Sequence, residues 1–177
     1  MSVDADERLS VELADDITRW KTSVETSPQP EIRANLAAWS MPRRVFYLGQ
    51  WINHSGWYPD RKVRLYDRRH CRFEGDFVHE SVTVDGNIGK FSGDLLHFPY
   101  RDWSDHAARI DRYTSLAAEA ARSRGARGNI LKLVLAPPLT FIKGFFFHAG
   151  FLDGWRGLAI AYMGARYVFT REFRILR

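Results

Sequence analysis

The chain has 177 residues, of which 45% are hydrophobic and 27% are charged, and its 26 basic and 21 acidic residues give a net charge of +5. This composition is typical of a folded protein with a buried core and excludes a wholly disordered chain. Its single cysteine, Cys71, excludes an internal disulfide and a cysteine-rich zinc site, so we expect a reducing compartment. The acidic N-terminus lacks the apolar segment of a signal peptide, and export is not expected.

The first notable motif is Asp4-Ala5-Asp6-Glu7. Two carboxylates that bracket a small residue suit a divalent cation that holds a diphosphate. An electrostatic alternative exists, because acidic residues also stabilise the approach to a helix N-terminus. Ser10 is a suitable N-cap for a helix from about Val11 to Val24, so both interpretations stay open.

Extended segments follow the chain-breaking sequence Ser27-Pro28-Gln29-Pro30. Alternating and β-branched residues predict strands within residues 39–52, 62–66 and 95–98. Asp85-Gly86, between two strand-like segments, predicts a tight hairpin. After Tyr100 the apolar period becomes 3.6, which predicts an amphipathic helix that ends near Gly125. Its predicted core-facing stripe is Trp103, Ala107, Ile110, Tyr113, Ala117 and Ala120.

Two loops carry candidate binding residues. In residues 54–60, turn-forming residues flank Trp57 and Tyr58, whose rings could stack on a sugar while Asp60 accepts hydrogen bonds from its hydroxyls. The alternative is a hairpin end in which the two rings cap the core. In residues 76–80, Glu80 could accept a proton from a hydroxyl nucleophile, and His79 could anchor the loop or meet a phosphate. The alternative there is a solvated acidic loop.

The C-terminal part combines apolar and basic residues. From Asn129 onward there are seven basic and two acidic residues, a local charge of 7 − 2 = +5. Residues 131–135, 141–147 and 158–163 are largely apolar, but Pro137-Pro138 and later polar residues are expected to interrupt them before the roughly 20 residues of a membrane span. We therefore expect helices that lie on a membrane surface, or alternatively an ordinary helical subdomain that packs these faces inward.

Seven segments carry further motifs: residues 2–13, 42–44, 49–52, 56–60, 64–66, 78–81, and 93–97 with 100–101. Their order resembles family 2 glycosyltransferases, within the bacterial branch that adds sugars to lipopolysaccharide or lipooligosaccharide core. The resemblance implies an α/β fold: a partial GT-A (nucleotide-diphospho-sugar transferase) domain with a mixed sheet in residues 1–101, followed by amphipathic C-terminal helices in residues 102–177. It also implies that the usual N-terminal nucleotide-binding half is missing before Asp4.

The same resemblance implies site residues, cofactor and partners. Asp4 and Asp6 are expected to bind Mg²⁺ or Mn²⁺, with His97 reaching the metal or the diphosphate or else buried in a strand. Glu80 is expected to be the catalytic base of an inverting sugar transfer. Trp57, Tyr58, Asp60 and His79 are expected to contact the donor or acceptor. The implied partners are a nucleoside-diphosphate sugar and a lipid-linked saccharide, at a cytoplasmic, peripheral position on the inner membrane.

Two other classes remain open from the residues alone. The sequence pI of 9.6 and the interleaved arginines and aromatics would suit a nucleic-acid-binding module, although no recognised motif for one is present and no nucleic acid is expected. A noncatalytic membrane-surface module would explain the apolar, basic C-terminal part without any catalysis.

Overall fold

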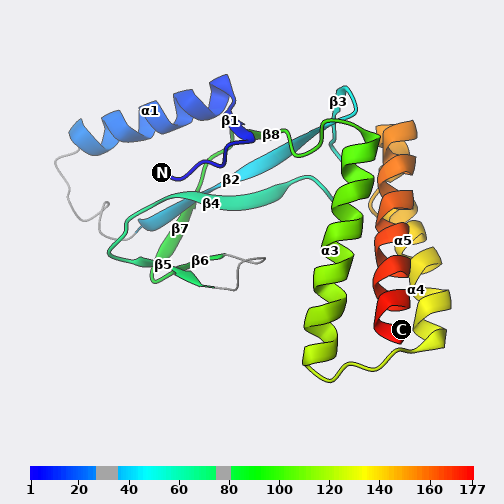
Figure 1. Ribbon diagram of the computed structural model, residues 1–177. Helices are drawn as coiled ribbons and strands as arrows, with labels where there is room; N and C mark the ends of the chain where they lie inside the picture. Colours follow the sequence, from blue (N-terminus) through cyan, green and yellow to red (C-terminus); the bar gives the residue numbers. More distant parts are fainter. Residues whose placement is uncertain (27–35, 75–80) are drawn as a thin grey trace. The chain divides into compact units, whose positions relative to one another are not determined.

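The structure is a computed structural model that describes residues 1–26, 36–74 and 81–177. The fold is mixed α/β, with a mixed sheet and C-terminal helices, as the sequence predicted (Figure 1). Contacts divide the chain into two compact units, one of Met1–Arg44 and Pro59–His97 and the other of Val45–Tyr58 and Phe98–Arg177. Residues 45–58 therefore group with the helices. The assignment of catalysis to residues 1–101 stays a prediction.

The first unit is organised around strand β2 (Leu36–Tyr47), whose first residues pair with β4 (Asp60–Tyr66) in antiparallel and with β7 (Asn87–Lys90) in parallel orientation. Strand β1 (Glu7–Leu9) pairs antiparallel with β8 (Leu95–His97) in the same sheet. Helix α1 (Val11–Thr26) begins after Ser10, whose hydroxyl caps the Leu13 amide, as predicted. The fully buried Leu13 joins a core of Met41, Phe91 and Leu95.

The predicted hairpin around Asp85-Gly86 is wrong. Strand β6 (Ser81–Val84) pairs with β5 (Cys71–Glu74) in a separate two-stranded sheet, whereas β7 joins β2. The Asp85 amide donates a hydrogen bond to the His70 carbonyl oxygen and so extends the β5–β6 pairing. Gly86 then has φ +134°, and a Cβ there would lie 2.9 Å from Ala37 Cβ, so the glycine lets the chain change sheets.

The second unit combines a short β-structure with the C-terminal helices. Strand β3 (Gln50–Trp51) pairs with the end of β2. The helices are α3 (Trp103–Ser123), α4 (Ile130–Ile142), the π-helix η1 (Lys143–Phe147), the 3₁₀-helix η2 (Gly150–Asp153) and α5 (Trp155–Leu176). Helix α5 packs against both α3 and α4. Its residues Ala159 and Ile160 share a core with Val45, Tyr47 and Ile52.

Helix α3 has the predicted bounds, but its predicted core stripe is only partly right. Asp102 is the N-cap and accepts a hydrogen bond from the Asp105 amide. The buried positions are His106, Ile110, Thr114 and Ala118, whereas Trp103 and Tyr113 of the predicted stripe are 40% and 43% exposed. Two of these four buried residues, His106 and Thr114, are polar. The buried face of α3 is therefore rotated around the helix from the apolar stripe that the sequence predicted.

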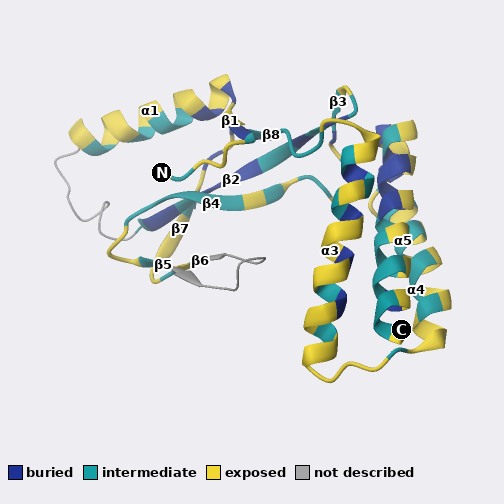
Figure 2. Cartoon of the chain, in the orientation of Figure 1, coloured by how far each residue is buried: buried dark blue, intermediate teal, exposed yellow. Residues whose placement is uncertain are grey.

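The expected interruption at Pro137-Pro138 does not occur. Both prolines lie inside α4, and the helical run continues through η1, so residues 130–147 form one run of 18 residues. Length and composition alone would allow this run to cross a membrane, which is weak evidence for a span. None of its residues is buried, and Figure 2 shows α4 in the colours of intermediate and exposed residues.

Candidate functional site

An acidic cluster in the first unit is built around the carboxylate of Glu7, whose side chain is fully buried. This carboxylate accepts a 2.7 Å hydrogen bond from Arg64 Nη2 and lies 3.5 Å from Arg43 Nη1. Arg64 also pairs with Asp4, whose side chain is 52% exposed. The Glu7 amide donates to the Asp4 carbonyl oxygen and closes the turn between them. Asp4 and Glu7 therefore share one guanidinium.

Asp6 has a different partner in the same segment. One of its carboxylate oxygens lies 3.3 Å from His97 Nε2, because the β1–β8 pairing sets His97 opposite Glu7. Burial lowers the pKa of His97 and the charge of Arg43 lowers it further, whereas Asp6 and Glu7 act to raise it. The imidazole is therefore mainly neutral near pH 7. The structure thus brings together Asp6 and His97, two of the three predicted metal-binding residues.

Two buried nitrogens in this cluster lack a hydrogen-bond partner. Across the ranges that the structure describes, they are Arg64 Nε and His97 Nδ1, and no other buried side-chain nitrogen or oxygen is in that state. Buried polar atoms normally pair with protein groups or water. Both belong to residues that contact the Asp4–Glu7 segment, so the cluster retains hydrogen-bonding capacity for an oxygen atom of a ligand or of water.

Two carboxylates of the cluster have the chemistry of ligands for a hard cation. The described part of the chain contains no group of three or more His, Cys, Asp or Glu residues able to enclose a metal ion. Mg²⁺, however, is usually held by one or two carboxylates together with substrate phosphates and water. Asp4 and Asp6 provide two carboxylates that are 52% and 41% exposed, and their hard oxygen atoms suit this kind of site.

Asp60 is held by cations in the first unit. It lies opposite Arg43 in the β2–β4 register, and its carboxylate is 2.6 Å from Arg43 Nη2 and 3.1 Å from Lys62 Nζ. Its side chain is 34% exposed, and each carboxylate oxygen has a cationic partner. The predicted contact of Asp60 with a sugar hydroxyl stays a prediction.

The loop that carries Trp57 and Tyr58 is fixed by Asp153, which is 2% exposed in η2. The Asp153 carboxylate accepts hydrogen bonds from the Asn53 amide at 3.1 Å, the His54 amide at 3.1 Å and the Ser55 hydroxyl at 2.8 Å. It also lies 3.2 Å from His54 Nδ1. One buried carboxylate thus ties three consecutive residues to the helical part of the second unit.

Trp57 packs against aromatic residues of the core. Its ring centroid lies 5.3 Å from that of Tyr47 and 5.9 Å from that of Tyr100. This matches the alternative in which Trp57 caps the core, while the role of the half-buried Tyr58 in binding stays a prediction. Beneath them, the Tyr47 hydroxyl lies 2.7 Å from His106 Nδ1, and burial lowers the pKa of His106 to about 4. The imidazole is therefore neutral near pH 7, and its tautomer determines which of the two groups donates this hydrogen bond.

Two predicted residues, His79 and Glu80, lie outside the described residues, so their roles stay predictions. Conversely, sequence reasoning missed Glu7 and Asp153 as organising residues. Glu7 adjoins the Asp-x-Asp motif, and Asp153 is one of only two acidic residues after Asn129. An acidic residue isolated in an apolar, basic segment is a usable signal, because burying it requires partners.

The comparisons with known proteins point to one class, the glycosyltransferases. The lipopolysaccharide core biosynthesis glycosyltransferase LpsC of Rhizobium meliloti (strain 1021) is 27% identical over 179 residues, which cover 98% of this chain. The chain spans 62% of the length of LpsC. No family model matches the chain, and no solved structure matches it. At this distance the similarity supports the predicted resemblance, while the assignment to family 2 stays a prediction.

Proposed function

We propose that the protein is an inverting, family 2-like glycosyltransferase with a GT-A type domain. It would transfer a sugar from a nucleoside-diphosphate donor to a lipid-linked saccharide such as lipopolysaccharide core. The observation that carries this proposal is the similarity to LpsC across 98% of the chain. The described geometry supports it, because the Asp-x-Asp motif lies in a cluster that has exposed carboxylates and unpartnered nitrogens.

Asp4 and Asp6 are the proposed ligands of Mg²⁺ or Mn²⁺. When bound, the cation would neutralise charge on the diphosphate leaving group. Glu7 fixes Arg64 beside Asp4 and thereby limits the motion of this segment. His97 orients Asp6 through the 3.3 Å contact, and a neutral imidazole leaves the charge of Asp6 available to the cation.

Glu80 is the proposed base, on the strength of the motif that it shares with the resembled family. It would take the proton from an acceptor hydroxyl while that oxygen bonds to the anomeric carbon and the bond to the diphosphate breaks. His79 would anchor the loop or meet a phosphate. Tyr58 and Asp60 would contact the donor or acceptor sugar. A lipid-linked acceptor would place the enzyme at the cytoplasmic face of the inner membrane.

A second candidate is a noncatalytic membrane-surface module. The pairing of Asp4 with Arg64 favours it, because the motif could then serve only to hold the N-terminal segment on β4. In that case no metal would bind, and sugar nucleotides would have no affinity for the chain.

Metal binding is the first test of the two candidates. Mn²⁺ titrated into the chain should lose its free-ion electron paramagnetic resonance signal, and combining Asp4→Asn with Asp6→Asn should restore it. Asp67→Asn is the matched control, since this aspartate pairs locally with Arg69. An unchanged Mn²⁺ signal with the wild-type chain would favour the noncatalytic module.

Sugar transfer is the second test. The chain, supplied with the nucleotide-binding half that the resemblance implies, should transfer from one of a panel of nucleoside-diphosphate sugars to lipooligosaccharide core only when divalent metal is present. Glu80→Gln should abolish transfer while largely sparing donor binding. Equal transfer by that variant would remove Glu80 as the base.

A further inference from the structure

The outer side of the α4–η1 run is a continuous apolar face. Its large side chains recur at three- and four-residue intervals, and each is between 42% and 66% exposed. They are Leu131, Val134, Leu135, Leu139, Ile142 and Phe146, here called the outer face. Exposed apolar stripes of this extent are unusual in a soluble protein without a partner.

The inner side of the same run carries small residues where it meets α5. A Cβ added at Gly144 would lie 3.7 Å from Ala161 Cβ, and one added at Gly164 would lie 3.7 Å from Thr140 Cγ2. In a water-soluble helix pair the large apolar residues pack inside. Here small residues lie at two points of contact, and the most exposed side chains of the run are large and apolar, a distribution that suits a helix in contact with lipid.

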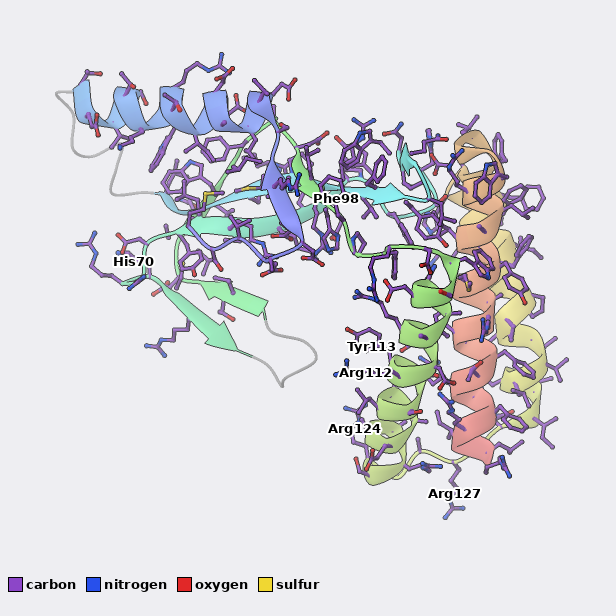
Figure 3. All side chains as sticks on the ribbon, turned by 45° about the horizontal axis from the view of Figure 1, so that its top comes forward. His70, Phe98, Arg112, Tyr113, Arg124 and Arg127 are labelled. Atoms are coloured by element: carbon purple, nitrogen blue, oxygen red, sulfur yellow. The ribbon has the colours of Figure 1, made fainter. Side chains whose placement is uncertain are left out.

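The charged residues near the outer face indicate which kind of partner this face contacts. The acidic residues after Asn129 are Asp153 and Glu172, and they are only 2% and 3% exposed. The exposed charges in this part of the chain are therefore cations, among them Lys143 at the junction of α4 and η1. Arg124 and Arg127 add exposed cations at the end of α3 and in the loop that leads to α4 (Figure 3). A surface with this composition complements anionic lipid headgroups.

We propose that the outer face inserts into one leaflet of an anionic membrane, with α4 lying in the plane of the bilayer. The run of 18 residues has a length of about 27 Å, close to the hydrocarbon thickness. If α4 crossed the bilayer, part of α5 would enter the hydrocarbon with it, because Glu172 of α5 is paired with Lys132 of α4 at 3.5 Å. Helix α5 is in turn bound to α3 through Arg174 and Asp111 at 2.5 Å. Such charges are costly within hydrocarbon, whereas in-plane insertion leaves them in water or among headgroups.

The turn after η1 links this surface to the aromatic loop. Phe151 and Leu152 of η2 are 50% and 59% exposed, and the next residue is Asp153, which holds residues 53–55. Trp155, two residues after Asp153, is 56% exposed. Tryptophan side chains are suited to the level of the lipid headgroups. The inference deepens the proposed function, because it sets the loop proposed to bind the acceptor beside the lipid that would carry that acceptor.

Spin labels can measure the orientation directly. In a Cys71→Ser background, single labels at Leu131→Cys, Leu139→Cys and Phe146→Cys should reach the same depth in phosphatidylcholine–phosphatidylglycerol vesicles, by their relative accessibility to oxygen and a polar nickel complex. A label at Glu119→Cys, on the exposed side of α3, should stay in water. Leu139 deeper than both neighbours would indicate a span, and all labels in water would show that lipid is not the partner. Either result overturns the proposal.

Vesicle flotation provides an independent readout that contains no sugar, so it succeeds or fails separately from the proposed transferase activity. Changing Leu131, Leu135 and Leu139 together to Gln should weaken binding to the same vesicles on the order of a hundredfold. Val11→Gln is the matched control, since Val11 is 75% exposed on α1. Lys143→Gln should weaken binding about fivefold on anionic vesicles and leave binding to pure phosphatidylcholine unchanged. Retained binding in the triple variant, with unchanged circular dichroism, would contradict the proposal.

Discussion

The Ser55 hydroxyl donates a 2.8 Å hydrogen bond to the carboxylate of Asp153, which lies 98 residues further along the chain. Ser55 has a positive φ of 60°, a backbone conformation that most residues avoid. The hydrogen bonds to Asp153 hold it there and fix the loop that leads to Trp57. The loop is therefore shaped by a residue of the apolar C-terminal part.

We predict that Asp153→Ala destabilises the second unit by about 3 kcal/mol, because it leaves the amides of Asn53 and His54 and the buried hydroxyl of Ser55 without their acceptor. Urea unfolding monitored by tryptophan fluorescence measures this. Ser55→Ala removes a single donor and should cost about 1 kcal/mol. Asp67→Ala, which removes an exposed carboxylate paired with Arg69, should change stability little. Equal effects of Asp153→Ala and Asp67→Ala would show that Asp153 does not hold the loop.

Acid should destabilise the second unit through His106. Burial lowers the pKa of His106 from 6.5 to about 4, so between these values the unfolded chain binds a proton that the folded chain does not. Stability should therefore fall as the pH decreases from about 6.5 towards 4, with a total loss from this group of about 3 kcal/mol. Urea unfolding at a series of pH values gives the slope.

The control for this prediction removes both partners of the hydrogen bond. Tyr47→Phe combined with His106→Leu deletes the buried donor and acceptor together, so the pH slope between 6.5 and 4 should become shallower. His148→Gln changes an exposed histidine of the same unit and should leave the slope as it is. An unchanged slope in the double variant would show that another group is responsible.

Glu7 should matter more for the stability of the first unit than the neighbouring Asp60. The Glu7 side chain is fully buried and contacts two arginines, so Glu7→Gln leaves those cations undercompensated and should cost about 3 kcal/mol. Asp60 is 34% exposed, and Asp60→Asn should cost less than about 1 kcal/mol. Denaturation followed by circular dichroism compares them. A larger effect for Asp60→Asn would contradict this account of the cluster.

Two glycines of α5 should respond in opposite ways to alanine. A Cβ at Gly157 would lie 1.8 Å from the Gly150 carbonyl oxygen, so Gly157→Ala should destabilise the second unit by about 2 kcal/mol or more. At Gly164 the nearest atom, Thr140 Cγ2, is 3.7 Å away, and Gly164→Ala should be neutral or stabilising by up to about 1 kcal/mol. Thermal unfolding of the two variants is the measurement. A stable Gly157→Ala variant would mean that η2 does not pack closely on α5.

Local signals predicted much of the first unit and the bounds of α3. The predicted Ser10 cap is present, α3 ends close to Gly125 as predicted, and the segments at residues 62–66 and 95–97 are strands. These features depend on backbone geometry within a few residues, which periodicity and capping preferences describe. The Asp-x-Asp motif could be recognised for the same reason. Its ion-pair partners, Arg64 and His97, could not be predicted, because they lie far away in the sequence.

Long-range pairing decided the rest. Asp85-Gly86 has the sequence of a hairpin turn, yet β7 pairs with β2, because a strand takes its partner from the whole sheet and not from its neighbour in sequence. His106 is buried because Tyr47, 59 residues away, supplies its hydrogen bond, and Asp153 is buried because residues 53–55 surround it with donors. Local sequence signals thus determined where α1, α3 and several of the strands form. Only the tertiary structure decided which polar groups are buried, because burial is tolerated only where distant residues complete the hydrogen bonds.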